Sequence, residues 1–147
     1  MDNLNIKGVA LTPLQHIETS GGSVLHSLKA SDKEFKGFGE AYFSIVNFGK
    51  VRGWKKHNQM TSNLIVPMGE VKFVLVEDKP DQSQEAFNEI ILSRKNFCRL
   101  TIPPGIWLGF QGLSQEDNLI LNLANIEHDP AETDTKNLDR FDYDWTI

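Results

Sequence analysis

Short runs of β-branched and aromatic residues, separated by turn-forming residues, dominate the chain between Val24 and Leu123. The runs recur at intervals of roughly 8–12 residues, a spacing typical of all-β sandwiches and barrels. Helix-period stretches are nearly absent, and only Asp81–Ala86 and Asp134–Phe141 favour a turn or a short helix. The pattern predicts seven strands: Ser23–Leu28, Ala41–Phe48, Leu64–Pro67, Glu70–Glu77, Ala86–Leu92, Phe97–Ile102 and Asn118–Ala124.

The last stretch, residues 125–147, follows a different pattern, with single apolar residues spaced among acidic ones. Its apolar anchors are Leu138, Phe141, Tyr143 and Trp145. We expect this stretch to pack across the outside of the predicted sheet, or alternatively to cover a partner subunit. The chain has no internal repeat and no linker-like segment, so we expect residues 1–147 to form a single domain.

Charge is unevenly distributed along the chain. The net charge is −5, from 15 basic and 20 acidic residues, and residues 127–147 hold seven of the acids but only two basic residues. A neutral body with an acidic tail lacks the basic face that nucleic-acid binding requires, so we expect no nucleic-acid partner. The one basic cluster consists of Lys50, Arg52, Lys55 and Lys56. Such a cluster is either a solvated face or a site for a small anion, since Arg and Lys are the usual partners of phosphate.

Features that would indicate export or a membrane are missing from the sequence. No run approaches the roughly 18 apolar residues of a membrane-spanning helix. Residues 1–7 lack the basic start and apolar stretch of a signal peptide. The single cysteine, Cys98, permits no internal disulfide and no cysteine-cluster metal site. These observations predict a cytoplasmic protein with no membrane partner.

Four histidines are the obvious candidates for acid–base chemistry. His26 lies in a predicted strand, in phase with the apolar Val24 and Leu28, and is either a core residue or a base. His57 directly follows the basic cluster, and structural and functional roles are equally open for it. No HExxH, CxxC or HxH spacing occurs, so no metal site is predicted. There is also no nucleophile elbow, phosphate loop or dinucleotide fingerprint. The residues alone therefore predict a β barrel or sandwich with a basic, aromatic-lined patch.

Four segments carry a resemblance to a known family: YFSIVN at 42–47, VRGWKKH at 51–57, PMGEV at 67–71 and LTIPPGIWLGF at 100–110. Their order and spacing over roughly residues 40–130 resemble the dTDP-4-dehydrorhamnose 3,5-epimerases, and IPPGxxxGF is the most specific piece. The resemblance implies a cupin-type double-stranded β-helix (jelly roll), here with a short, partly irregular C-terminal extension. It also implies a homodimer whose barrel mouth holds a nucleotide-linked 4-keto-6-deoxysugar.

The reaction that the resemblance implies is removal of a proton beside the ketone and reprotonation on the opposite face. This chemistry needs a base, a proton donor across from it, and a group that stabilises the enolate. It requires neither a metal nor an organic cofactor, because the ketone itself accepts the electron pair.

The chain departs from the family pattern at several positions. Lys55 stands where the family has its base histidine, and His57, two residues later, lies on the same face of an alternating strand. Ser62 replaces a family lysine, Leu108 replaces the histidine of IPPGxxHGF, and the arginine before the first motif is replaced near Glu40. The usual tyrosine acid falls near 121–122, where the chain has Leu and Asn.

The resemblance nevertheless leaves a set of candidate site residues. His57 is the candidate base, or Lys55 if burial or the neighbouring Lys56 and Arg52 favour its neutral amine. His26 and Glu40, predicted on adjoining strands, are candidates to supply or relay the second proton. The candidate substrate-binding residues are Arg52, Lys29, Trp54 and Asn63, with Trp107 as an alternative stacking partner.

Three functions remain open on this evidence. The first is a divergent isomerase, an epimerase or ketoisomerase of a nucleotide-linked 4-keto-6-deoxysugar in surface-polysaccharide sugar biosynthesis. The second is a non-catalytic sugar-nucleotide-binding cupin, a pseudo-enzyme. The third is other chemistry on a small anionic ligand, such as dehydration or lyase work. The replacement of several family residues argues against the family's own reaction. The polar candidate residues that remain argue against a protein that has lost all function.

Overall fold

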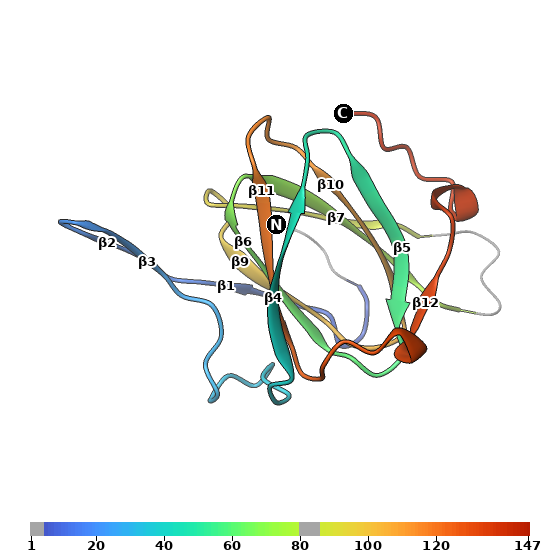
Figure 1. Cartoon of the computed structure of the whole chain (residues 1–147), viewed down its shortest axis with the longest axis horizontal. Helices are drawn as coiled ribbons and strands as arrows, with labels where there is room; N and C mark the ends of the chain where they lie inside the picture. The colour runs from blue at the N-terminus through green and yellow to red at the C-terminus, as the bar shows by residue number, and fades with distance from the viewer. Residues whose placement is uncertain (1–4, 80–85) are drawn as a thin grey trace.

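Two five-stranded antiparallel sheets lie face to face in the computed structural model, which describes residues 5–79 and 86–147 (Figure 1). The first sheet has the strand order β1-β9-β6-β11-β4, and the second has the order β12-β5-β10-β7-β8. From β4 to β7 and again from β8 to β11, each strand lies in the opposite sheet from the one before it. This crossing pattern is a jelly roll, and it confirms the predicted all-β, cupin-type fold.

The strand boundaries are as follows. The first sheet contains β1 (Ala10–Pro13), β4 (Glu40–Val46), β6 (Ser62–Met68), β9 (Cys98–Ile102) and β11 (Asn118–Ala124). The second contains β5 (Val51–His57), β7 (Glu70–Glu77), β8 (Asn88–Ser93), β10 (Ile106–Gly112) and β12 (Thr133–Thr135). A separate hairpin consists of β2 (His16–Thr19) and β3 (Gly22–Leu25), and two 3₁₀ helices, η1 (Pro130–Glu132) and η2 (Leu138–Arg140), lie near the end.

All seven predicted strands overlap observed ones, but five observed strands were not predicted. The most important of these is β5, whose sequence VRGWKKH is too polar to show the apolar runs on which the prediction relied. Strand β10, IWLGFQG, is interrupted by glycine. The turn or helix predicted at Asp81–Ala86 falls almost entirely outside the described residues. The short helix predicted within Asp134–Phe141 is the single turn η2.

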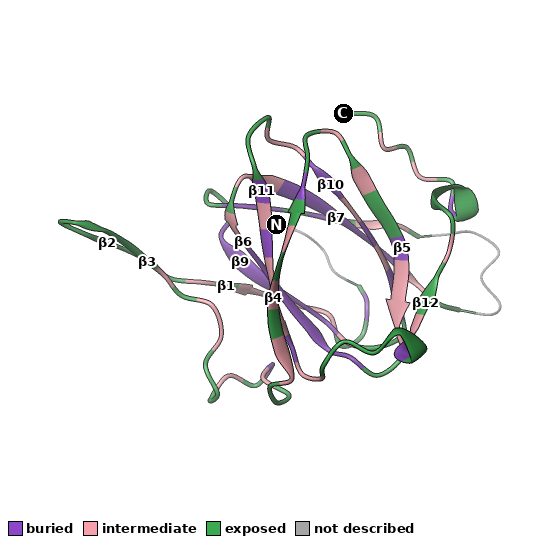
Figure 2. Ribbon diagram, viewed as in Figure 1, coloured by how far each residue is buried: buried purple, intermediate pink, exposed green. Residues whose placement is uncertain are grey.

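The apolar core fills the space between the two sheets at one side of the barrel. Strands β7 and β9 are buried along most of their length (Figure 2). The inward side chains there include Phe73, Leu75, Ile90 and Leu100, which are fully buried. A tight turn at Gly69, whose φ of 82° suits glycine, joins β6 directly to β7. At another side, inward polar residues of β4, β5 and β11 line a cavity, among them Tyr42, His57 and Asn122.

The C-terminal segment packs across the outer face of the second sheet, as predicted from its apolar anchors. Phe141 and Trp145 contact the ring of Trp54, with centroid distances of 5.0 and 5.6 Å. Gly109 of β10 permits this close packing, because a Cβ there would lie 3.0 Å from ring atoms of both Trp54 and Trp145. The indole N–H of Trp54 donates to the carbonyl of Leu138 at 3.0 Å. The segment therefore belongs to the folded body rather than forming a loose tail.

The hairpin β2–β3 projects away from the two sheets (Figure 1). Seven of its eight strand residues are exposed, including the apolar Ile17 and Val24. Strand β4 forms an edge of the first sheet, and its outward Phe43 and Ile45 are 64% and 54% exposed. The protein thus presents an isolated arm and an apolar sheet edge to its surroundings.

Among the described residues, no helix is long and apolar enough to cross a membrane. The predictions of one domain over residues 1–147 and of a cytoplasmic location stay predictions.

Candidate active site

A cavity of about 280 Å³ lies between the two sheets, close to the lower end of the size range of small-ligand sites. Its apolar wall consists of Leu64, Phe73, Leu108, Phe110 and Ile120. Its polar wall consists of Tyr42, Ser44, Arg52, Lys55, His57, Ser62, Asn122 and Thr135. No Asp or Glu from the described part of the chain lines it. The wall therefore holds two cations without a facing carboxylate.

Strand β5 supplies the charged part of the wall, and its pairing with β10 explains why. Lys55 lies opposite Leu108 and Arg52 lies opposite Phe110, and both β10 residues pack inward against the core. Directly opposed residues in an antiparallel pair point to the same face, so both cations point inward. The Arg52 guanidinium lies 5.6 Å from the centre of the Phe110 ring.

The three-residue spacing from Arg52 to Lys55 would put them on opposite faces of a regular strand. A register shift between Leu108 and Phe110 sets two residues of β5, Gly53 and Trp54, against Gly109 alone. This β-bulge brings Arg52 back to the inner face. His57 then follows Lys55 at the regular spacing of two, so three chemically active side chains share one wall.

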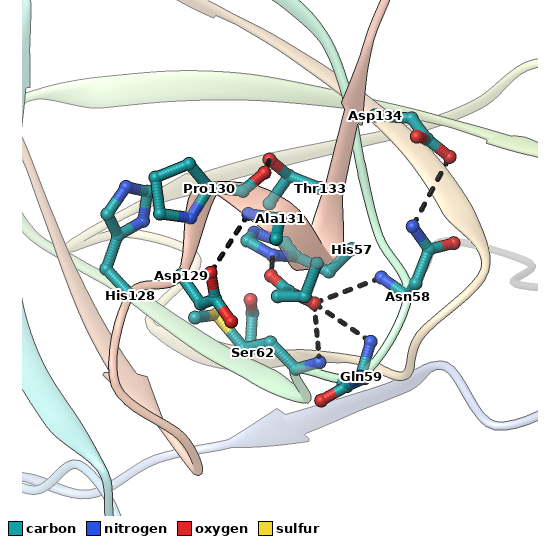
Figure 3. Close-up of polar contacts among 12 residues, drawn as sticks. His57, Asn58, Gln59, Ser62, His128, Asp129, Pro130, Ala131, Thr133 and Asp134 are labelled. Atoms are coloured by element: carbon teal, nitrogen blue, oxygen red, sulfur yellow. Dashed lines mark hydrogen bonds and ion pairs between the residues drawn. The ribbon is translucent and has the colours of Figure 1, made fainter.

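His57 is held from behind by a carboxylate of the C-terminal segment. Its Nδ1 atom is hydrogen-bonded to Oε1 of Glu132, the last residue of η1 (Figure 3). The other carboxylate oxygen accepts the backbone N–H groups of Asn58, Gln59 and Met60 at 3.1, 2.9 and 3.2 Å. Glu132 therefore fixes both the imidazole ring and the loop that follows β5.

This arrangement determines the protonation of the pair. Burial raises the pKa of Glu132, but hydrogen bonds from His57, Gln59 and Met60 lower it more, and the net pKa lies below its usual value. The carboxylate is thus ionised near neutral pH and can only accept, so Nδ1 of His57 carries the proton that they share. The Nε2 atom of His57 is left as the nitrogen that can take a proton from a ligand.

A second polar group lies on the opposite sheet. The hydroxyl of Tyr42 on β4 accepts a hydrogen bond from the side-chain amide of Asn122 on β11 at 2.9 Å. The amide nitrogen of Asn122 also lies 3.5 Å from the hydroxyl of Ser62. The Oδ1 atom of Asn122 is buried and has no hydrogen-bond partner among the described residues. The wall facing β5 therefore offers a phenol that can donate a proton and an acceptor that a ligand hydroxyl can satisfy.

Three of these residues are not among those predicted from the sequence. Tyr42 and Asn122 are inward positions of alternating strands, and strand phase could have found them: the burial of β4 and β11 alternates residue by residue. Glu132 gave no such signal. It lies 75 residues from His57 in a segment expected only to pack, and a single acid before a short turn is not distinctive.

Four predicted site residues are brought together. Arg52, Lys55 and His57 line the cavity, and Trp54 borders it. The Trp54 ring is almost fully buried, however, and packs outward against Phe141 and Trp145, so it is not placed to stack on a ligand. The ring of Trp107 packs against Phe141 in the same outer cluster.

The other four predicted residues lie elsewhere. His26 follows the end of β3 and, with Lys29, lines a separate pocket beside Arg99, so the expectation that its strand would converge on the barrel mouth is not met. Asn63 faces outward from β6, where its Oδ1 atom accepts the hydroxyl of Thr101 at 2.5 Å. Glu40, the first residue of β4, accepts a hydrogen bond from the backbone N–H of His128 at 2.9 Å. Functional roles for these four stay predictions.

Neither wall contains an obvious metal centre. Across residues 5–79 and 86–147, no three His, Cys, Asp or Glu side chains are grouped to hold a metal ion. Leu108 occupies the cavity wall at the position where the family motif has its histidine.

Comparisons with known proteins agree with this fold and extend it. The chain is 32% identical to a dTDP sugar isomerase from Desulfovibrio desulfuricans G20, with a TM-score of 0.89 over 95% of this chain and 92% of that one. It is 24% identical over 137 residues to a probable low-salt glycan biosynthesis epimerase, Agl13, from Haloferax volcanii, covering 91% of this chain and 88% of that protein. A dTDP-4-dehydrorhamnose 3,5-epimerase from Elizabethkingia anophelis is only 16% identical but has the same fold, with a TM-score of 0.80 over 99% of this chain and 85% of that one.

These findings confirm the predicted resemblance to cupin-type sugar epimerases and refine it. The model of the family described as FdtA: WxcM-like, C-terminal matches residues 7–142, which is nearly the whole chain. That match includes β5, the cavity and the C-terminal segment that carries Glu132. The chain belongs to the FdtA, WxcM-like C-terminal family of sugar-nucleotide epimerase and isomerase-like proteins.

Proposed function

We propose that the protein is an epimerase or ketoisomerase that moves a proton beside the ketone of a nucleotide-linked 4-keto-6-deoxysugar. Its family and its relatives, among them a dTDP sugar isomerase at 32% identity, support an enzyme-like role in glycan biosynthesis. A dTDP-linked sugar is the first substrate to test, because that relative carries dTDP sugar in its name. The observation that carries the proposal is the placement of a carboxylate-backed histidine beside two uncompensated cations.

The charge of the cavity favours an anionic ligand. Arg52 and Lys55 line it, and no acidic residue of the described chain does so. Two cations that face no carboxylate are stabilised by a diphosphate, and the planar guanidinium of Arg52 suits bidentate binding of phosphate oxygens. The sugar then extends from Arg52 toward Lys55 and His57 along the same strand.

The two walls supply the acid–base pair that the reaction needs. Nε2 of His57 takes the proton from the carbon beside the ketone, and Glu132 stabilises the imidazolium that forms. The electron pair delocalises onto the ketone oxygen, where a cation of β5 stabilises it. Tyr42, on the opposite sheet, returns a proton from the other side. If the proton returns to the same carbon on the opposite face, the sugar is epimerised. If it returns to the former ketone carbon while the neighbouring hydroxyl loses its proton, the ketone moves to the next carbon.

Solvent exchange tests this proposal directly. Pure protein incubated in D₂O with dTDP-4-keto-6-deoxyglucose is expected to place deuterium on a carbon beside the ketone, as followed by NMR. The same ligand is expected to stabilise the fold, by about 2.7 kcal/mol at a hundredfold excess over Kd. Arg52→Leu is expected to weaken binding about 10- to 100-fold, because it removes a charge-assisted contact.

Lys50→Ala is the matched control, since Lys50 belongs to the same basic cluster but is exposed and outside the cavity wall. Tight binding without exchange would favour the non-catalytic sugar-nucleotide-binding cupin instead. Loss of water from the sugar would favour dehydration. Absence of both binding and exchange would contradict the proposal.

We also propose that two copies associate through the β2–β3 arm and the outer face of β4. A two-stranded hairpin is marginally stable alone in water, and a free sheet edge with exposed aromatic side chains invites pairing. The arm exposes Ile17 and Val24, and the sheet edge exposes Phe43 and Ile45. Contact between such surfaces would remove apolar area from water on both copies.

Light scattering after gel filtration is expected to give the mass of a dimer for the natural chain. The double variant Phe43→Asp, Ile45→Asp is expected to shift it to a monomer, because it places charges in the proposed contact. Ile91→Asp is the control, since Ile91 is also an exposed apolar residue but lies on the opposite edge of the other sheet. A natural chain with monomer mass, or equal effects of both changes, would contradict the association.

A further inference from the structure

The side chain of Asn122 lies beside the phenol of Tyr42 on the inner face of the first sheet. The two residues are directly opposed in the pairing of β11 with β4, so both side chains point to the same face, and both line the cavity. Strand β4 is at the edge of the described sheet, where β11 is its one neighbour. Asn122 is therefore well placed to set the direction of the Tyr42 hydroxyl.

The amide of Asn122 presents its nitrogen to the phenol. That nitrogen donates to the Tyr42 hydroxyl at 2.9 Å, and it lies 3.5 Å from the Ser62 hydroxyl and 4.0 Å from the sulfur of Met60. A thioether sulfur has no hydrogen to donate, so an amide oxygen would gain nothing from Met60 in this position. Asn122 is only 5% exposed, and its surroundings thus favour one orientation of the amide.

The direction of this hydrogen bond leaves the phenol proton available to a ligand. The Tyr42 oxygen accepts from the amide, and its hydroxyl donates to no other group of the described residues. An amide N–H cannot take up a proton, so Asn122 does not compete with a ligand for it. The same N–H binds more strongly to the charged oxygen that remains once the proton has been given. The pair is thus arranged as an acid and the group that orients it.

We infer that Asn122 is a positioning residue that aims the proton of Tyr42 at the bound enolate; this inference rests on the proposed function, which brings a keto sugar between Tyr42 and His57. His57 removes a proton from carbon, and the electron pair moves onto the ketone oxygen. Tyr42 then gives its proton to a carbon of the enolate from the other side, and an electron pair of the enolate forms the new C–H bond. The cycle closes when solvent takes one proton from His57 and returns one to Tyr42.

Two fates compete for the enolate, and the orientation of Tyr42 decides between them. Protonation by Tyr42 gives the isomerised product, whereas protonation by His57 from its own face returns the starting sugar. In D₂O the second fate places deuterium in the starting sugar, because the imidazolium exchanges its proton with solvent. The ratio of deuterated starting sugar to product does not depend on affinity or on the amount of folded protein, because both fates begin from the same bound enolate.

This ratio tests the inference, measured by NMR at early times with dTDP-4-keto-6-deoxyglucose in D₂O. Asn122→Leu has a similar volume but no donor, and it is expected to raise the ratio about 10- to 100-fold, the effect of misplacing a reacting group. Asn122→Asp keeps the shape of the side chain, but its carboxylate accepts the phenol hydrogen, so the ratio is expected to rise as well.

Tyr42→Phe shows whether Asn122 acts through the phenol. This variant is expected to raise the ratio at least as much as Asn122→Leu. The double variant Tyr42→Phe, Asn122→Leu is expected to raise it no further than Tyr42→Phe alone, because the two residues act as one unit. A double variant whose ratio rises by the product of the two single effects would overturn the inference.

Gln111→Leu is the matched control. Gln111 is also a buried amide, whose nitrogen donates to the carbonyl of Trp145 at 2.9 Å and whose oxygen has no partner in the described chain. It does not line the cavity. This variant is expected to be less stable but to keep the ratio of the natural chain. A rise equal to that of Asn122→Leu would overturn the inference, because loss of any buried amide would then suffice.

The natural chain separates the two levels of the proposal. Exchange and product formation by the natural chain, with an unchanged ratio in Asn122→Leu, would overturn the role of Asn122 and leave the proposed function standing. Exchange without product would also overturn that role, because no proton would then reach the enolate from Tyr42. Absence of both binding and exchange would overturn the inference and the proposed function together.

Discussion

His57→Asn is expected to slow deuterium exchange beside the ketone by about 10²- to 10⁴-fold, the range that a positioned general base supplies. Asparagine preserves a polar side chain of similar size, but it cannot take up the proton that Nε2 accepts. Binding of dTDP is expected to change little, because Arg52 and Lys55 remain in place. Exchange rates by NMR and dTDP affinity by calorimetry measure the two effects separately.

His128→Asn provides the control for this experiment. His128 is exposed and lies near the same 3₁₀ turn, but its ring does not line the cavity (Figure 3). This variant is expected to exchange at the rate of the natural chain. An unchanged rate in His57→Asn would show that another group removes the proton and would contradict the assignment of His57 as the base.

Glu132→Ala is expected to lower the free energy of unfolding by about 3–5 kcal/mol, as removal of one partner from a buried charged pair typically does. The change leaves the N–H groups of Asn58, Gln59 and Met60 without their acceptor and frees the ring of His57. Glu132→Gln keeps an acceptor oxygen but not the charge, so a smaller loss of stability is expected. Urea unfolding followed by tryptophan fluorescence measures both.

The pH dependence of stability gives an independent test of the same residue. Because the pKa of Glu132 is lowered in the folded protein, its charge stabilises the fold above the usual glutamate pKa of about 4.5. That contribution is lost as the pH falls below this value and through the folded-state pKa. The natural chain is therefore expected to lose more stability than Glu132→Gln as the pH falls from about 5 through the folded-state pKa of Glu132. Glu127→Gln is the control: Glu127 is exposed, so the stability of this variant is expected to follow that of the natural chain at each pH. Equal pH dependence of stability in the natural chain and Glu132→Gln would contradict a stabilising charge on Glu132.

The fold was predictable from sequence because most strands bury one face. Strands β7, β9 and β11 carry the apolar residues that fill the barrel, and their predicted boundaries differ from the observed ones by at most one residue. Strand β5 was not predicted, because it borders a cavity on one side and carries charged side chains toward it. Three of the polar residues that hid β5 from the prediction, Arg52, Lys55 and His57, are the ones that line the cavity.

The site was only partly predictable, for two physical reasons. Lys55 and His57 follow from simple alternation, so their shared face was foreseen. His26 was placed by the same rule, but β3 leaves the barrel as an arm, and alternation within a hairpin says nothing of where the hairpin lies. Glu132 reaches His57 through a contact across 75 residues, which no local pattern encodes.

The β-bulge at Gly53 and Trp54 means that the direction of Arg52 depends on the number of residues in β5, not only on their identity. Loss of a single codon there would restore plain alternation, and the guanidinium of Arg52 would rotate to the far surface while Lys55 and His57 kept their direction. One deletion could therefore uncouple the proposed phosphate recognition from the proposed proton transfer, without exchanging any of the three side chains.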